Sequence, residues 1–346
     1  MRILYIETQN QFSGIGRYTE DYHKLLPDCS NIIQFVFRKR YINTSVDVQK
    51  FYATKSNILN LTLGKVLFKN IINKINTSGQ IIHITSHVFP PTVKFNKKLS
   101  ILTVHDLIAF KFRDNYSRFL TSYYKYAINK NMKHYTNILT VSNHVKKEIL
   151  ERYNVKDKYI SVIPPVISDY FYHVPDKAEL RKKLNLPLDK KLILSVSTME
   201  KRKNTGMIQK VMEKINGDFN LVRVGEVIGN SITFKNVDKI TINEIYNACD
   251  MLYFPTLEEG FGIPLVEAMR VGIPIVSSNI PVVKEVVGDA GKLVDPNDVD
   301  ENIEAIYHVA ENPNYYILKG YERSKLYSGE TVKEKLYKYY STISCN

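Results

Sequence analysis

The stretch that decides the fold reads Glu259-Gly-Phe-Gly-Ile-Pro-Leu-Val-Glu267-Ala-Met269. An apolar segment with strand character, 251–255, comes directly before it, and a helix-compatible segment, 266–271, forms its end. The residues that follow, 272–277, have the pattern of a second strand. The predicted order is therefore strand, glycine-containing loop, helix and strand, which is the repeating unit of a parallel α/β sheet.

The loop of this unit has the composition of an anion site. Gly260 and Gly262 carry no side chain, so the backbone can approach a ligand closely. The helix behind the loop directs free N–H groups and the positive end of its dipole towards the same place. Glu259 on the loop and Glu267 in the helix bracket the turn. Acids beside an anion site suit a ligand that is part phosphate and part polyol, and a nucleotide sugar is such a ligand.

This segment resembles the E-x7-E block of the retaining glycosyltransferases of family 4. Other blocks of that family occur in the same order along the chain: Ser13-Gly-Ile-Gly-Arg17, Thr103-Val-His-Asp106, Thr140-Val-Ser142, Glu200-Lys-Arg-Lys-Asn204 and Gly288-Asp-Ala-Gly291. The resemblance implies an α/β protein of the GT-B fold. Such a protein has two Rossmann-like doubly wound domains facing each other across a cleft, and a C-terminal helix that crosses back to the first domain.

Length and composition agree with two soluble domains. The chain has 346 residues and 44% hydrophobic content, and no run approaches the roughly 18 apolar residues typical of a spanning helix. The first residues, 1–7, have too short an apolar core for a secretion signal and are predicted to form a strand. Cys29, Cys249 and Cys345 lie far apart without metal-ligand spacing, so we expect reduced thiols in a cytoplasmic protein.

The net charge of +13 at pH 7 favours anionic partners such as nucleotide sugars, lipid-linked phosphates or anionic lipid headgroups. No nucleic-acid motif occurs, so nucleic acid is not an expected partner. The charge indicates either peripheral contact with an anionic inner-membrane face or a lysine-rich lineage, and the sequence leaves both open.

Strand and helix patterns alternate twice along the chain, which predicts two parallel sheets. Strands are expected at 2–7, 32–37, 80–85, 99–104, 137–141, 191–196 and 219–224. Helices are expected at 15–26, 116–133, 143–153, 204–215, 242–248 and about 330–340. The paired prolines of Val162-Ile-Pro-Pro-Val166 favour extended backbone and mark the boundary. We therefore predict an acceptor-side domain, 1–165 with 330–346, and a domain for the nucleotide sugar, 166–329.

Gly14-Ile-Gly16-Arg17 opens the first predicted helix and has two glycines of the dinucleotide fingerprint. Thr19 stands where the third glycine would be, and an ordinary glycine-rich turn would look similar. The resemblance implies that Gly14 and Gly16 lie over the donor diphosphate, where a side chain on Gly16 would collide with the phosphates.

Three consecutive cations, 201–203, follow the strand 191–196. Such a run is usually a solvated patch, but at the carboxyl end of a strand it can neutralise a diphosphate. The resemblance to the E-x-R-K-N pattern implies that Arg202 and Lys203 stabilise charge on the leaving nucleoside diphosphate, and that Glu200 belongs to the donor site.

One contact of that pattern is missing. Some members of the family carry a further arginine two or three residues before the glutamate, where this chain has Ser197 and Thr198. One phosphate contact is therefore either absent or differently supplied.

The two glutamates of the E-x7-E block have different implied roles. Glu267 matches the residue that accepts hydrogen bonds from the ribose hydroxyls, and Glu259 matches one that contacts the donor sugar. An isolated glutamate would more often be a surface or capping carboxylate. The resemblance implies that, together with the loop amides, the donor-binding residues of this block are Gly260, Phe261, Gly262, Ile263 and Glu267.

His105 and Asp106 end the strand 99–104. A lone histidine there is more often structural, but the resemblance implies that His105 lies against the donor sugar near the reacting carbon. Asp106 would orient it or contact the acceptor. Neither is expected to be a general base, because retaining members react on one face of the sugar and the departing phosphate oxygen can take the acceptor proton.

No metal and no other cofactor are expected. Asp298-Val-Asp300 resembles a D-x-D metal motif, but its place before a helical pattern favours helix capping. His83 and His87 are four residues apart across a strand end, where that spacing does not make a pair of zinc ligands.

The segment 116–135 is rich in tyrosine and lysine, including Tyr123-Tyr-Lys-Tyr126, Lys130 and Lys133. It suits either a membrane interface or acceptor site, or a core-packed helix with solvated lysines. The basic run 38–40 lies in no recognised site.

The predicted function is transfer of a hexose, of the mannose or glucose type, from a nucleoside-diphosphate sugar to a hydroxyl of a saccharide or lipid-linked glycan. The alternatives are a nucleotide-sugar epimerase or hydrolase of the same fold, and a non-catalytic nucleotide-sugar-binding protein. The expected location is the cytoplasm, and the positive net charge suggests peripheral contact with the inner membrane face as an alternative.

Overall fold

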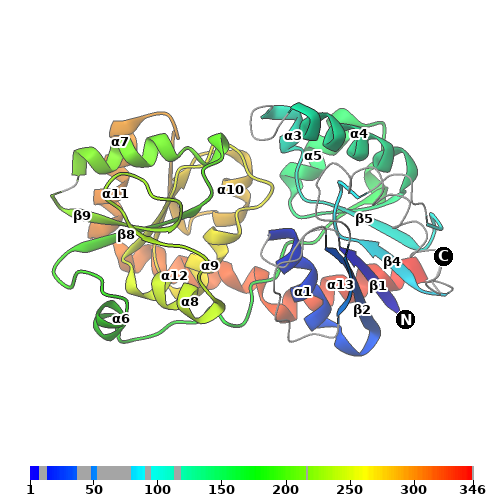
Figure 1. Ribbon diagram of the computed structural model, residues 1–346, viewed down its shortest axis with the longest axis horizontal. Helices are drawn as coiled ribbons and strands as arrows, with labels where there is room; N and C mark the ends of the chain where they lie inside the picture. The colour runs from blue at the N-terminus through cyan, green and yellow to red at the C-terminus, as the bar shows by residue number, and fades with distance from the viewer. Residues whose placement is uncertain are drawn as a thin grey trace. The chain divides into compact units, whose positions relative to one another are not determined.

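The computed structural model describes residues 1–7, 14–36, 48–52, 79–89, 95–112, 118–215 and 217–344. The chain divides into two compact units (Figure 1). The first is Met1–Val166 with Glu330–Asn346, and the second is Ile167–Gly329. The basic run 38–40 and residue Cys345 lie outside the described residues.

The first unit is built on a parallel sheet. Its strand order is β3 (Val48–Tyr52), β2 (Ser30–Val36), β1 (Ile3–Glu7), β4 (Ile81–Ile84), β5 (Ser100–Val104), β6 (Asn137–Thr140) and β7 (Ile160–Val162). The order reverses at β1, which pairs with β2 on one side and β4 on the other. The carboxyl ends of strands at such a reversal are where doubly wound sheets bind ligands.

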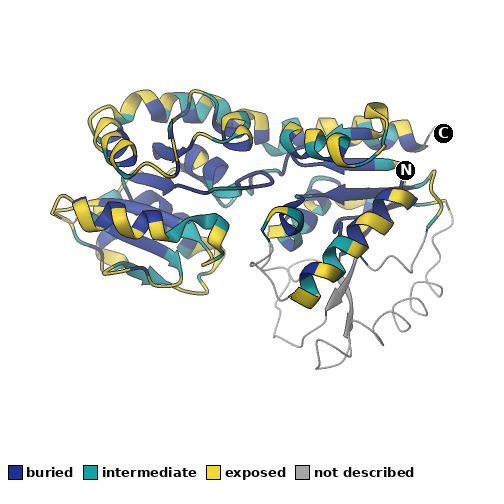
Figure 2. Cartoon of the chain, turned by 90° about the horizontal axis from the view of Figure 1, so that it is seen from above, coloured by how far each residue is buried: buried dark blue, intermediate teal, exposed yellow. Residues whose placement is uncertain are grey.

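Helices cover this sheet on both faces (Figure 1). They are α1 (Gly14–Leu25), α3 (Ile108–Lys111), α4 (Arg118–His134), α5 (Asn143–Arg152) and α13 (Gly329–Ser344). The central strands are apolar along their length because both faces are covered, and Ile3, Ile6 and Ile84 are fully buried. In Figure 2 these strands are dark blue and the outer sides of the helices yellow.

The second unit repeats this plan. Its strand order is β10 (Ile232–Phe234), β9 (Phe219–Gly225), β8 (Lys191–Ser197), β11 (Met251–Phe254), β12 (Ile275–Ser278) and β13 (Gly291–Val294). Its helices are α6 (Lys177–Lys183), α7 (Thr205–Ile215), α8 (Lys239–Ala248), α9 (Ile263–Val271), α10 (Pro281–Val287), α11 (Val299–Glu311) and α12 (Pro313–Ser324). All neighbouring strands pair in parallel, so the predicted α/β class with two parallel sheets is confirmed.

One apolar cluster joins α7 and α11 to the sheet of the second unit. Ile193 of β8 and Phe219 and Leu221 of β9 pack in it with Val211 of α7 and Ile306 of α11. The side chains of a strand alternate between its faces, so every second residue of β8 and β9 points towards this cluster. This register decides which residues lie on the same face at the carboxyl ends of the two strands.

The E-x7-E segment folds as predicted in type, but its helix begins earlier, and the strand after it begins later, than predicted. The helix α9 begins at Ile263 because Gly262, with φ of +94°, is its N-cap. It ends at Val271, as predicted, because Gly272, with φ of +81°, is a left-handed C-cap. The next strand, β12, begins at Ile275 rather than at residue 272.

The last helix belongs to the first unit. Tyr340 of α13 is fully buried, and its hydroxyl lies 2.6 Å from Nδ1 of His83 and donates to the hydroxyl of Tyr5. Nε2 of His83 lies 2.6 Å from the Thr103 hydroxyl. Both ring nitrogens of His83 are thus engaged by hydroxyls, and burial lowers its pKa to about 3.

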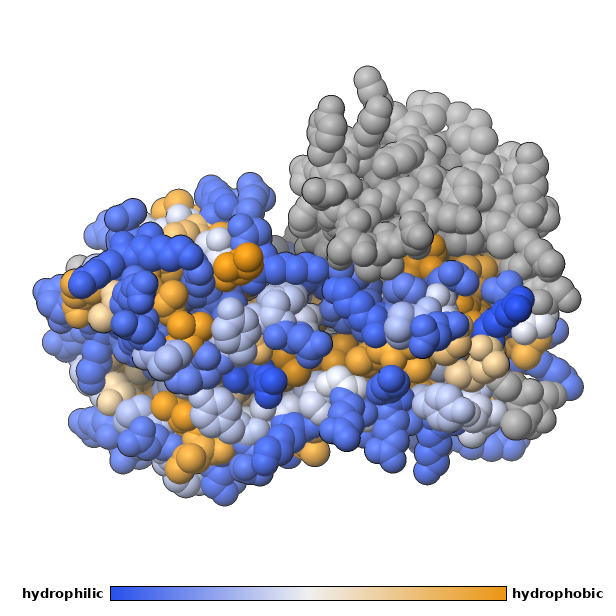
Figure 3. All heavy atoms as spheres, turned by 90° about the horizontal axis from the view of Figure 1, so that it is seen from below, coloured by the Kyte–Doolittle hydropathy of each residue, from blue (hydrophilic) through white to orange (hydrophobic). Residues whose placement is uncertain are grey.

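No helix in the described ranges has both the length and the apolar character needed to cross a membrane. Hydrophilic residues cover most of the described surface on the face that Figure 3 shows. The described cysteines, Cys29 and Cys249, are free thiols.

Candidate functional site

An ion-pair cluster forms where β8 and β11 of the second unit end. We use this name for Glu200, Arg202, Lys203 and Glu259. Nε of Arg202 donates to Glu200 at 2.7 Å, and Nη1 of Arg202 donates to Glu259 at 3.0 Å. The ammonium of Lys203 donates to the other oxygen of Glu259 at 2.6 Å. The structure thus brings together residues that the sequence places 57 positions apart.

Glu259 is held as an anion in this cluster. It is 7% exposed, and burial alone would raise its pKa. The charges of Lys203 and Arg202, with the hydrogen bond from Thr256, outweigh burial and hold the pKa of Glu259 below its usual value. Glu259 therefore pairs with both cations and fixes their side chains, while its predicted contact with a donor sugar stays a prediction.

Backbone contacts join the two loops that carry the cluster. The amide of Leu257 donates to the carbonyl of Arg202 at 2.7 Å, and the Thr256 hydroxyl donates to the same carbonyl at 3.0 Å. A short 3-10 turn, Lys201–Lys203, ends at Asn204 in the left-handed region, and α7 follows. The cations are therefore placed by rigid backbone rather than by a free loop.

The start of α9 adds backbone donors close to Glu259 in sequence. A Cβ built on Gly262 would lie 2.8 Å from Cδ1 of Leu265, so this turn requires glycine for both space and φ. Phe261 is buried and packs edge-on against Tyr327. Glu267 is 3% exposed and accepts a hydrogen bond of 2.6 Å from Tyr246. The predicted contact of Glu267 with ribose hydroxyls remains a prediction.

His105 of the first unit has a defined tautomer. Its Nε2 lies 2.8 Å from the carbonyl oxygen of Thr85, which can only accept, so Nε2 carries the proton. Burial, together with nearby His87, lowers the pKa of His105 to about 4, so the ring is neutral at pH 7. The ring packs edge-on against Tyr18 at 4.7 Å. His105 thus presents Nδ1 as a hydrogen-bond acceptor.

Asp106 does not orient His105 through a hydrogen bond. Its Oδ1 accepts from the amide of Ile108 at 3.0 Å at the start of α3. The backbone of Thr85 orients the ring instead. Of the two roles expected for Asp106, contact with the acceptor is the one that stays a prediction.

A buried polar group at the end of β1 was not predicted from the sequence. Glu7 is 1% exposed and accepts hydrogen bonds from Thr19 at 2.5 Å and from Thr85 at 2.8 Å. Thr19 was noted only because it replaces the third glycine of the fingerprint. Its hydroxyl now explains that departure, because a glycine there would leave the buried Glu7 carboxylate without this donor. Gly14 begins α1, and Gly16 is buried within it.

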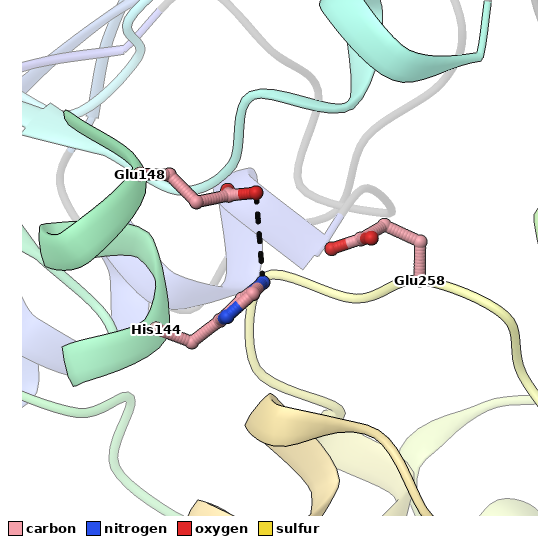
Figure 4. Close-up of side chains that lie close together, drawn as sticks. All are labelled: His144, Glu148 and Glu258. Carbon is pink, nitrogen blue, oxygen red and sulfur yellow. Dashed lines mark ion pairs between the residues drawn. The ribbon is translucent and has the colours of Figure 1, made fainter. Parts of the chain in front are cut away.

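Two groups of acidic and histidine side chains lie outside the ion-pair cluster. Asp298 accepts from the amides of Asp300 and Glu301 at 3.0 Å each, which confirms helix capping at α11. In α5, Glu148 pairs with His144 at 3.6 Å (Figure 4) and also with Lys111. Glu258, labelled in the same figure, belongs to the second unit.

On α4, the residues of the tyrosine-rich segment divide between the core and solvent. Tyr123 and Tyr124 are half-buried, whereas Phe119, Tyr126 and Lys130 are exposed. The helix therefore packs into the first unit and also presents a basic and aromatic side. Residues 113–117 lie outside the described part.

Two family models match this chain: "Glycosyl transferases group 1" over residues 176–323 and "Glycosyltransferase Family 4" over residues 49–169. Among curated proteins, O-antigen chain mannosyltransferase RfbU of Salmonella typhimurium is 28% identical over 62% of this chain and 61% of its own length. O-antigen chain mannosyltransferase B of Escherichia coli is 28% identical over 58% of each chain. The match thus spans about three fifths of these relatives.

Solved structures share the fold over almost the whole chain. Sucrose-phosphate synthase from Thermosynechococcus elongatus has a TM-score of 0.81 at 18% identity and covers 99% of each chain. Anabaena HepE in complex with UDP and glucose has a TM-score of 0.78 at 14% identity, again over 99% of each chain. At such identities the likeness concerns the fold alone, and it confirms the predicted GT-B architecture.

Proposed function

The chain belongs to the group 1 glycosyltransferases of family 4, and from this we propose its function. It transfers a hexose from a nucleoside-diphosphate sugar to a hydroxyl of a saccharide or lipid-linked glycan. The observation that carries this proposal is the ion-pair cluster beside the start of α9. There, two positioned cations pair with the buried carboxylate of Glu259, just before the N-terminus of a helix of the same unit.

The names of the relatives support the mannose type of hexose. Both O-antigen proteins are named mannosyltransferases, and so is the phosphatidyl-myo-inositol mannosyltransferase of Mycolicibacterium smegmatis, which is 30% identical over 35% of this chain. These names also favour a glycan or lipid-linked acceptor. On the acceptor side, the exposed Phe119, Tyr126 and Lys130 of α4 support peripheral contact with an anionic membrane face.

The chemistry follows from charge that develops as the glycosidic bond to the diphosphate breaks. Arg202 and Lys203 stabilise the leaving diphosphate, and the amides at the start of α9 add donors to the same group. Glu259 keeps both cationic side chains extended in the site before the donor arrives. His105 and Asp106 keep their predicted roles towards the sugar and the acceptor.

The glycosidic product is expected to keep the anomeric configuration of the donor. Front-face attack needs only a leaving diphosphate that is held in place, and its oxygen can take the proton of the acceptor hydroxyl. NMR of the first-formed product from a purified protein, a nucleotide sugar and an acceptor measures the configuration. A β product from an α donor would overturn the proposed mechanism, and free nucleotide without a glycoside would favour a hydrolase.

Activity is expected to survive an excess of EDTA. Side-chain cations and a helix N-terminus take the place that a metal ion has in D-x-D enzymes. The measurement compares initial rates before and after chelation and dialysis. A rate lost on chelation and restored by manganese or magnesium would contradict this prediction. Such a result would return attention to the D-x-D segment, in which Asp298 caps α11.

A further inference from the structure

The ion-pair cluster has no excess positive charge to offer a diphosphate. Two cations, Arg202 and Lys203, face two carboxylates, Glu200 and Glu259, so the formal charges cancel. Lys201 of the same turn is exposed to solvent, where its charge is screened. A site for an anion of higher charge therefore needs a further cation from elsewhere in the unit.

Arg223 of β9 is a buried cation beside this site. Its side chain is fully buried, and β8 and β9 pair so that Arg223 lies opposite Ser195. Nη1 of Arg223 donates to the hydroxyls of Ser195 and Ser197, both at 2.9 Å. Nη2 donates to the carbonyl of Ser197 at 2.8 Å, and Nε donates to the carbonyl of Glu226 at 3.3 Å. All these acceptors are neutral groups.

Within the described residues, no carboxylate pairs with Arg223. The acid that acts on it most is Glu226, which is largely exposed and pairs with Lys235 at 2.7 Å. Burial lowers the pKa of Arg223 to about 10, so it remains charged at neutral pH. A buried charge without a counter-ion is costly to a fold, and such charges are normally paired.

A second buried arginine of the same unit shows the ordinary arrangement. Arg181 of α6 is 6% exposed and donates to Asp250 at 2.6 Å, before β11 begins. Arg181 therefore carries its counter-ion at the amino end of the sheet, whereas Arg223 has none at the carboxyl end. The carboxyl end is also the end that carries the ion-pair cluster.

The Arg223 guanidinium lies at the position where this chain lacks the additional arginine that some related sequences carry. It rests on Ser197, the last residue of β8, and Ser197 and Thr198 stand where some related sequences carry an additional arginine. From Ser197 the chain runs directly into the turn that bears Arg202 and Lys203. The guanidinium of Arg223, on the neighbouring strand, thus lies against Ser197, one of the two positions where some related sequences carry that additional arginine.

We propose that Arg223 is a further residue of the donor site, whose positive charge acts on the diphosphate of the donor. Its guanidinium holds the end of β8 by the Ser197 carbonyl, and the bound diphosphate acts as the counter-ion that none of the described residues provides. This inference rests on the proposed donor site and extends it by a residue on a third strand.

Binding of inorganic pyrophosphate to the full chain, measured by calorimetry at low salt, tests the proposal. Arg223→Met, which keeps an unbranched side chain but removes the guanidinium and its charge, is expected to weaken binding about tenfold, the scale of one partly screened charge interaction. Arg223→Lys should retain most of the affinity. The double variant Arg223→Ser with Ser197→Arg moves the charge to the neighbouring strand and should restore binding relative to Arg223→Ser.

Arg181→Met is the matched control, because it removes another buried arginine and should lower stability without changing the pyrophosphate affinity. Wild-type affinity in a folded Arg223→Met protein would overturn the proposal. If Arg223→Met does not fold, failure of the moved charge to restore binding would overturn it equally. Lys203→Ala distinguishes an error in the donor site from an error in the role of Arg223. If Lys203→Ala and Arg223→Met both bind pyrophosphate as the wild type does, the donor site itself is misplaced. If Lys203→Ala weakens binding and Arg223→Met does not, only the assignment of Arg223 is wrong.

Discussion

Replacing Lys203 by alanine is expected to reduce turnover by about two orders of magnitude, the scale of losing one preorganised charge-stabilising donor in an active site. The ammonium of Lys203 is mostly buried and fixed 2.6 Å from Glu259, so it needs no reorganisation when the diphosphate departs. Arg202→Ala should have a similar effect, because Arg202 is held by two carboxylates. Steady-state rates with a nucleotide sugar and acceptor give the measurement.

A matched control for this prediction is Lys214→Ala. Lys214 of α7 pairs with Asp300 at 2.8 Å, but both side chains are exposed, and such surface pairs contribute little. We therefore expect wild-type turnover and nearly wild-type stability for that variant. Unchanged turnover of both Lys203→Ala and Arg202→Ala would show that the ion-pair cluster is not the donor site.

Acid is expected to destabilise the first unit strongly below pH 6.5. Burial lowers the pKa of His83 to about 3 and that of His105 to about 4, and it also lowers the pKa of His87. Above pH 6.5 these rings are neutral in both states and contribute no pH dependence. As the pH falls below 6.5, the unfolded chain binds protons that the folded unit excludes, so the free energy of unfolding decreases.

The size of this effect follows from linkage. Each fully excluded proton costs about 1.4 kcal/mol per pH unit, and the unfolded histidines are half protonated at pH 6.5, so His83 and His105 together remove about 3 kcal/mol between pH 6.5 and pH 5. Thermal unfolding followed by circular dichroism over this range measures the loss. His83→Gln should flatten the pH dependence even if it lowers stability at neutral pH, whereas His308→Gln, at an exposed position, should leave it unchanged. An unfolding temperature that does not change from pH 7 to pH 5 would contradict the prediction.

Much of the fold could be predicted because its long elements carry regular patterns. The helix α7 and the strands β8 and β9 were placed within a few residues by their apolar periodicity. The short strands β7, β10 and β13 were missed, since three or four residues are too few to show a period. The start of α9 was placed too late because the left-handed Gly262, rather than any apolar pattern, sets it.

The candidate site was predictable as a set of residues but not as a set of contacts. Motif resemblance indicated Arg202, Lys203 and Glu259, yet only the folded chain shows that Glu259 pairs with both cations. Arg223 left no signal, because its partners Ser195 and Ser197 lie on a different strand. Glu7 was likewise hidden, since a single acid at the end of an apolar strand looks like an ordinary exposed terminus.

The return of α13 to the first unit has a consequence for biosynthesis. One side of this helix, which carries Val332, Leu336 and Tyr340, is fully buried. Residues 167–329 leave the ribosome as one continuous segment and can fold while translation proceeds. The first unit, although synthesised earlier, must wait for residues 330–344 to emerge before Tyr340 can reach His83 and Tyr5. During that interval the part of the first unit that α13 covers, including His83 and Tyr5, stays without that cover.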